Sequence, residues 1–110
     1  MDAAMNPARR AAWDAYLAVR VGLLPDLDVL PVRDHRVAAK LAGLAVRIRQ
    51  HARLWPDYGG KLVVAVGRAR ELQRAGDRAG LTALLRIMFL WLFRLSRGTA
   101  RLPGTAPGSS

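Results

Sequence analysis

The sequence predicts an all-α protein, a compact four-helix bundle, on three observations. Apolar residues recur at intervals of three and four in four separate segments, the spacing that aligns one face of an α-helix. Residues that favour helix N-termini, namely Asn6, Asp34 and Asp77, precede three of these segments. The chain has 110 residues, of which 52% are hydrophobic, enough for one core. We therefore expect a bundle domain over residues 1–97 and a disordered C-terminal tail over residues 98–110, which is rich in Gly, Pro, Ser and Thr.

The first helix is expected over residues 7–23, because Pro7 suits a first helical turn and Pro25 should end the helix. Residues 25–33 contain two prolines and two aspartates and are interpreted as a connector. The apolar stripe of this helix is predicted to comprise Trp13, Tyr16, Leu17, Val21 and Leu24. Three apolar residues of the connector are expected to attach it to the core: Leu27, Val29 and Leu30.

The second helix is expected over residues 35–55 and has the clearest amphipathic pattern. Its apolar stripe is Val37, Leu41, Leu44, Ile48 and Trp55. The third helix is expected over residues 58–75, where Gly67 should permit close approach of a neighbouring helix. Its predicted buried residues are Tyr58, Leu62, Ala65, Val66, Ala69 and Leu72. Gly76 and Asp77 predict a tight turn, so the third and fourth helices should pack antiparallel.

The fourth helix, expected over residues 78–97, is the most apolar segment. Its core stripe is predicted to be Leu81, Leu84, Leu85, Met88, Trp91, Leu92 and Leu95. Other apolar side chains, among them Phe89, Leu90 and Phe93, lie on the opposite side between arginines. We interpret these three as a protein–protein contact surface. The alternatives are core packing and, less favoured, base stacking.

The charge of the chain is strongly basic, with a net charge of +10 and only two lysines, Lys40 and Lys61, among eighteen basic residues. No acidic residue occurs between His35 and Pro56 or after Asp77. Such a field attracts polyanions. One side of the second helix is predicted to contact phosphates through Arg36, Lys40, Arg47 and His51, extended on the third helix by Arg68, Arg70 and Arg74. The alternative is that these side chains only solvate their helices and cover apolar flanks.

Catalytic chemistry is not expected. The chain has a single glutamate, Glu71, no cysteine, and two histidines, His35 and His51, without metal-ligand spacing. Serine occurs outside the predicted tail only at Ser96, so a Ser–His–acid triad is improbable. The Gly59-Gly60-Lys61 segment lacks the Ser or Thr that a phosphate-binding loop needs after its lysine. We therefore expect neither enzyme activity, nor a cofactor, nor a bound metal.

The N-terminal segment lacks the apolar core of a signal peptide, and the run over residues 87–93 is flanked by Arg86 and Arg94. A cytoplasmic protein without a membrane partner is therefore expected. Two alternatives remain. Residues 81–95 could lie in an anionic membrane interface, or the chain could be an interaction module whose basic face docks an acidic protein.

Residues 61–97 (KLVVAVGRAR…LLRIMFLWLFR) combine a basic, alanine-containing helix with an apolar, aromatic one. A small, basic, all-helical chain with this arrangement resembles the small subunits of CRISPR effector complexes. The resemblance implies a role and no individual site residue. It implies a non-enzymatic structural subunit that binds RNA or single-stranded DNA without sequence specificity. It also implies contacts with other protein subunits, including copies of itself.

Overall fold

The computed structural model describes residues 6–98 and confirms the four-helix bundle, with no strand in that range. The bundle consists of four helical rods. The first rod is built from three consecutive segments, α1 (Pro7–Leu17), a π-helical segment (Ala18–Leu23) and α2 (Leu24–Val29). The second is α3 (His35–His51), followed by a short 3₁₀ turn (Ala52–Leu54). The third and fourth are α4 (Gly59–Ala75) and α5 (Arg78–Ser96). Residues 99–110, for which a disordered tail was expected, lie outside the described residues.

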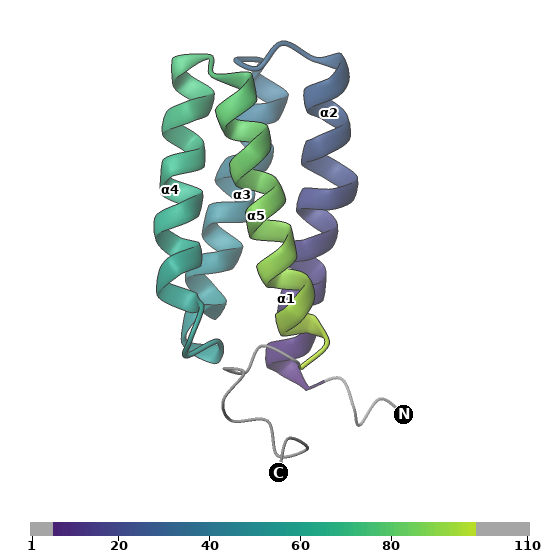
Figure 1. Cartoon of the computed structure of the whole chain (residues 1–110), viewed down its shortest axis with the longest axis vertical. Helices are drawn as coiled ribbons and strands as arrows, with labels where there is room; N and C mark the ends of the chain where they lie inside the picture. Colours follow the sequence, from purple (N-terminus) through teal and green to yellow (C-terminus); the bar gives the residue numbers. More distant parts are fainter. Residues whose placement is uncertain (1–5, 99–110) are drawn as a thin grey trace.

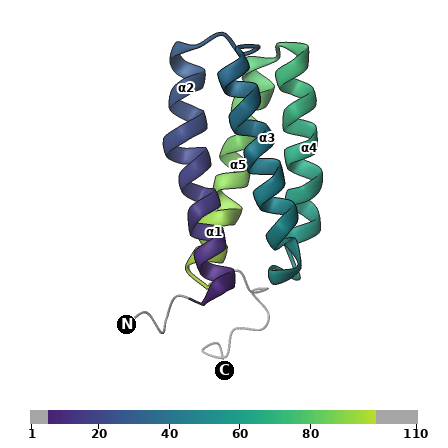
Figure 2. The same cartoon turned by 180° about the vertical axis from the view of Figure 1, so that it is seen from behind.

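The four rods run alternately up and down the long axis of the molecule (Figure 1). The α1–α2 rod packs against α3 on one side and α5 on the other, and α4 likewise contacts both α3 and α5. Seen from behind, α3 and α4 lie side by side at the front (Figure 2). The short turn at residues 76–77 makes α4 and α5 antiparallel, as the sequence predicted.

Pro25 does not end the first helix, so the expected connector over residues 25–33 is wrong for its first half. The rod continues through Pro25 to Val29. A proline in a helix lacks a hydrogen-bond donor, and its ring clashes with the carbonyl four residues earlier. The π-helical segment immediately before Pro25 relieves this clash, because the backbone N–H of Leu24 bonds to the carbonyl of Val19, five residues back.

The buried face of the first rod is also displaced from the predicted stripe. Its buried side chains are Ala11, Ala12, Ala15, Val19, Leu23 and Leu27. The small alanines let α1 pack closely against α5, and the larger Trp13 and Tyr16 lie along the flank of this contact, partly buried. Val21 and Val29 were expected in the core but are exposed. The expectation fails in α1 because it selected the large aromatic side chains, whereas the close contact with α5 is filled by alanines.

The remaining three helices contribute most of the core as predicted. All five residues of the predicted α3 stripe are buried, including Trp55 just beyond its 3₁₀ turn. On α5, the buried apolar side chains are Leu81, Leu85, Met88 and Leu92, whereas Leu84, Trp91 and Leu95 are only partly buried. Gly67 lies on the exposed side of α4 with open space around its Cα, so it does not mediate close helix packing as expected.

Hydrogen bonds from side chains to backbone carbonyls close both ends of the bundle. Gln73, a buried residue of α4, donates from Nε2 to the carbonyl of Val32 at 3.0 Å. At the opposite end, Nε1 of Trp55 donates to the carbonyl of Ala8 at 2.9 Å. Three arginines make similar contacts: Arg9 to Ser96, Arg33 to Arg74 and Arg78 to Leu30. Part of the high arginine content therefore serves the fold.

Candidate nucleic-acid interface

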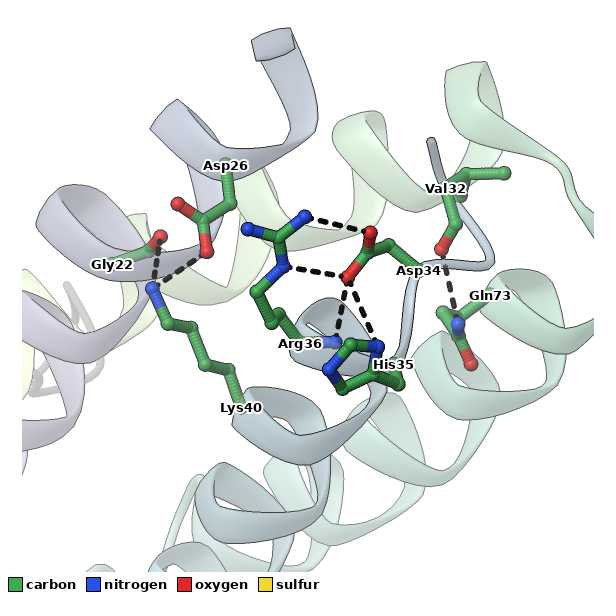
Figure 3. A network of polar contacts seen from close by, with 8 residues as sticks. All are labelled: Gly22, Asp26, Val32, Asp34, His35, Arg36, Lys40 and Gln73. Carbon is green, nitrogen blue, oxygen red and sulfur yellow. Dashed lines mark hydrogen bonds and ion pairs between the residues drawn. The ribbon is translucent and has the colours of Figure 1, made fainter. Parts of the chain in front are cut away.

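The first half of α3 is not a free basic surface, because two of its predicted phosphate contacts are already paired with acids (Figure 3). The guanidinium of Arg36 donates two hydrogen bonds of 3.0 Å to the carboxylate of Asp34. The Nζ of Lys40 lies 2.6 Å from Oδ2 of Asp26, a residue of α2. It also lies 3.5 Å from the carbonyl oxygen of Gly22.

Asp34 is both the N-cap of α3 and the partner of Arg36. Its Oδ1 accepts a 2.8 Å hydrogen bond from the backbone N–H of Arg36. The side-chain hydrogen bonds from Arg36, followed by this backbone bond, lower the pKa of Asp34 from 3.8 to about 2. The same pairing raises the pKa of Arg36. Asp34 is therefore ionised near neutral pH, and its negative charge opposes anion binding at Arg36.

The second half of α3 and the 3₁₀ turn after it differ from the first half in their ion pairing. Arg47, Arg49 and Arg53 are exposed and form no ion pair with any of the described residues. His51 is partly buried, with its Nδ1 2.9 Å from the carbonyl oxygen of Arg47. Its ring packs at 6.3 Å from that of Trp55. The free positive charge of this helix is thus concentrated towards its C-terminal end.

The three arginines predicted on the third helix divide between two sides of α4. Arg68 lines a groove between α4 and α5, and its Nη1 pairs with Oε1 of Glu71 at 3.1 Å. At about 100° per residue, Arg70 and Arg74 lie on the other flank of α4, beside α3. Neither forms an ion pair with a described residue. Arg68 therefore lies on a different flank of α4 from Arg70 and Arg74, and the predicted phosphate contacts of all three stay predictions.

Helix geometry places Arg49 on the flank of α3 that faces α4. Arg53 follows in the 3₁₀ turn Ala52–Leu54. The other flank, which carries Lys40, Gly43 and Arg47, lines a depression against the π-helical segment. Helices α3 and α4 run antiparallel side by side (Figure 2). One end of their seam is therefore bordered by Arg49 and Arg53, beside the start of α4, and the other end by Arg70 and Arg74, beside the start of α3. None of these arginines pairs with an acid among the described residues. We call this the α3–α4 basic face: Arg49, Arg53, Arg70 and Arg74.

Two of these four arginines, Arg70 and Arg74, were predicted from the sequence as phosphate contacts that extend the set on α3, and that stays a prediction. The sequence-based prediction left out Arg49 and Arg53. The sequence does not show which flank of α3 packs against α4. The small residues on that flank, Ala38, Ala42 and Ala45, were a usable signal, since they allow a neighbouring helix to approach.

The three residues predicted as a protein contact surface have different surroundings. Phe89 is partly buried and meets Tyr16 of α1 edge-on at 5.9 Å, with the guanidinium of Arg20 5.8 Å from its ring centre. Phe93 also contacts Tyr16, at 5.5 Å, but stays accessible. Leu90 is half exposed. Phe89 therefore contributes mainly to the α1–α5 contact, whereas Leu90 and Phe93 are available to a partner.

Two further observations bear on the chemistry of the chain. Within residues 6–98, no group of three or more His, Cys, Asp or Glu side chains is arranged to hold a metal ion. Helix α5 is long and apolar enough to cross a membrane by length and composition, although no such segment was expected. In the bundle, Leu81, Leu85, Met88 and Leu92 of this helix lie in the core, whereas Ile87, Leu90 and Phe93 are exposed.

Comparisons with known proteins found no similarity that identifies the chain. No family model matches it, and neither a curated protein nor a solved structure is significantly similar to it. The resemblance to CRISPR small subunits therefore remains a hypothesis drawn from charge and helix pattern.

Proposed function

We propose that this protein is a non-enzymatic structural subunit that binds the backbone of RNA or single-stranded DNA through the α3–α4 basic face. The observation that carries the proposal is the pair of arginines at each end of the seam between two antiparallel helices, none of them paired with an acid among the described residues. Guanidinium groups are well suited to bidentate phosphate contacts, and such contacts dominate affinity that is independent of sequence.

The shape of this face favours contact with the backbone over contact with base edges. A single helix, about 10–12 Å wide, fits the major groove of a duplex, which is about 12 Å wide. Helices α3 and α4 are packed together, so the surface that they share is too broad to enter that groove. On α4, Arg70 and Arg74 are one turn apart, about 6 Å along the axis. Arg49 and Arg53 lie at the other end of the seam, so a strand lying over the seam would meet a pair of cations at each end.

A role within a larger cytoplasmic ribonucleoprotein is part of the proposal. Leu90 and Phe93 supply accessible apolar surface for neighbouring subunits, including copies of this chain. The resemblance to CRISPR small subunits suggests the kind of assembly, in which such a subunit would support a guide–target duplex or a displaced strand.

The test compares two variants with equal loss of charge. In the first, Arg49, Arg53, Arg70 and Arg74 are changed to Gln. In the control, two arginines of the first rod and two of α5 and its C-terminal end are changed to Gln: Arg10, Arg20, Arg86 and Arg97. Binding of labelled single-stranded RNA and DNA of several sequences is measured against salt, with circular dichroism to verify the fold. Each contact to a single strand contributes about 0.7 to the slope of log affinity against log salt.

We expect the first variant to lose about three units of slope with every sequence, and the control to lose less than one. Equal losses in the two variants would disprove a localised interface. Loss of binding to one sequence only would show that bases are read. Tight binding to anionic vesicles at matched salt, without binding to nucleic acid, would favour the peripheral membrane alternative through α5.

A further inference from the structure

A second surface of the molecule is an apolar groove on the far flank of α4, where this helix meets α5. The groove has a volume of about 640 Å³. Its lining residues are Gly60, Lys61, Val64, Ala65, Arg68, Leu84 and Trp91. It plays no part in the proposed nucleic-acid interface, which lies on the opposite flank of the same helix.

Several apolar side chains that line this groove are exposed to solvent. Val64 is 73% exposed, and Leu84 and Trp91 are only partly buried. On α5 the apolar surface continues through Ile87 and Leu90, which are 45% and 50% exposed. Contiguous apolar surface of this kind, bordered by charged residues, is typical of a protein-binding site.

The groove has the shape of a site for a helix. It runs between two antiparallel helices, and its α4 wall from Gly60 to Arg68 is about 12 Å long, roughly two helical turns. At the Gly60 end, no atom lies within 4 Å of where a Cβ would be, so a partner backbone can approach there. An amphipathic helix placing residues i, i+3 or i+4, and i+7 in the groove would cover Val64, Leu84 and Trp91.

The charges at the rim select the kind of helix. Lys61 forms no ion pair with a described residue, and its Nζ lies 5.6 Å from the ring centre of Tyr58. The pair between Arg68 and Glu71 is more than 60% exposed on both sides, so it can exchange for another carboxylate at little cost. A second copy of this chain, with its own net charge of +10, would bring like charges to the same rim.

We propose that the α4–α5 groove binds an amphipathic helix of a partner protein, whose apolar face contacts Val64, Leu84 and Trp91. Acidic residues that flank this face pair with Lys61 and Arg68. Because α4 carries the groove on one flank and Arg70 and Arg74 on the other, the chain can hold a protein helix and a nucleic-acid strand together. The groove does not depend on nucleic-acid binding and can be tested separately.

The experiment uses the isotopically labelled full chain and two designed helical peptides. Both peptides carry the same leucines at positions i, i+3, i+4 and i+7, flanked by Glu in one and by Lys in the other. We expect the Glu-flanked peptide to bind at least tenfold more tightly. The NMR shift changes should centre on Gly60, Val64 and the indole of Trp91. Absence of a preference, or changes centred elsewhere, would refute the proposal.

Variants make the test specific. Val64→Asp should weaken binding of the Glu-flanked peptide at least tenfold, whereas Val29→Asp, at a valine that is 77% exposed on α2, should not. Changing Lys61 and Arg68 together to Glu involves only exposed side chains, so we expect the fold to be retained. This double variant should reverse the preference between the peptides. Self-association or binding to anionic vesicles that Val64→Asp abolishes would instead assign the groove to a second copy or to lipid.

Discussion

Lys40 of α3 and Asp26 of α2 form an ion pair, with Nζ and Oδ2 2.6 Å apart, that joins the first rod of the bundle to the second. Lys40 lies in a stretch without acidic residues and is therefore a natural candidate for a phosphate contact. The partner comes from fourteen positions earlier in the chain. This pair reduces the positive field at the start of α3, whereas the arginines of the α3–α4 basic face have no acidic partner among the described residues.

The pair can be tested through its effect on nucleic-acid binding. Asp26→Asn should release Lys40 and steepen the slope of log affinity against log salt by about 0.7, the contribution of one single-strand contact. The control is Asp28→Asn, which adds the same charge at an exposed residue without an ion pair to any described residue. If both variants steepen the slope equally, only the net charge matters. The stability change of Asp26→Asn should stay below about 1 kcal/mol, because the pair is partly exposed.

The pH dependence of stability should reflect Asp34. Its pKa is lowered to about 2 in the folded chain, so the unfolded chain binds more protons between about pH 4 and pH 2. The stabilisation is therefore present above the unfolded value of 3.8 and is lost as the pH falls through 2. In Asp34→Asn, the side chain can still cap α3 but carries no charge. Melting temperatures of the two proteins should differ at pH 5 and converge towards pH 2; a constant difference would contradict this role.

Two adjacent leucines of α5 should differ sharply in their contribution to stability. Leu85 is fully buried, and its change to Ala should cost about 2–5 kcal/mol in the free energy of unfolding. Leu84 lines the α4–α5 groove and is partly exposed, so the same change should cost about 1 kcal/mol. Urea denaturation of both variants measures the difference. Equal costs would mean that the groove is closed in solution.

Two glycines should respond in opposite directions to substitution by alanine. Gly67 lies inside α4 with open space around it, so Gly67→Ala should stabilise the protein by about 0.5–1 kcal/mol. Gly76 ends α4 with a φ of 77°, a left-handed conformation that costs alanine about 1–2 kcal/mol. A Cβ at Gly76 would also lie 3.3 Å from Nε of Arg33. Thermal unfolding distinguishes the two, and destabilisation by Gly67→Ala would place that glycine at a contact.

The sequence by itself determined the helices and much of the core. The stripe Val37, Leu41, Leu44 and Ile48 is buried as predicted, because its spacing leaves α3 only one apolar face. The starts of α1, α3 and α5 follow from Asn6, Asp34 and Asp77, each of which accepts a backbone hydrogen bond from its own first turn. These features depend on residues close together in the chain, and a local pattern contains that information.

The tertiary structure alone decided which face of the first rod is buried, that the helix continues through Pro25, and which arginines make up the basic surface. Ala12 and Ala15 are buried in preference to Trp13 and Tyr16, because the close approach of α1 to α5 requires small side chains. Whether a cation is free depends on acids from other elements, as Asp26 shows for Lys40. Which arginines share a surface depends on which helix flanks meet. Charge and packing act through space, so residues distant in sequence determined both.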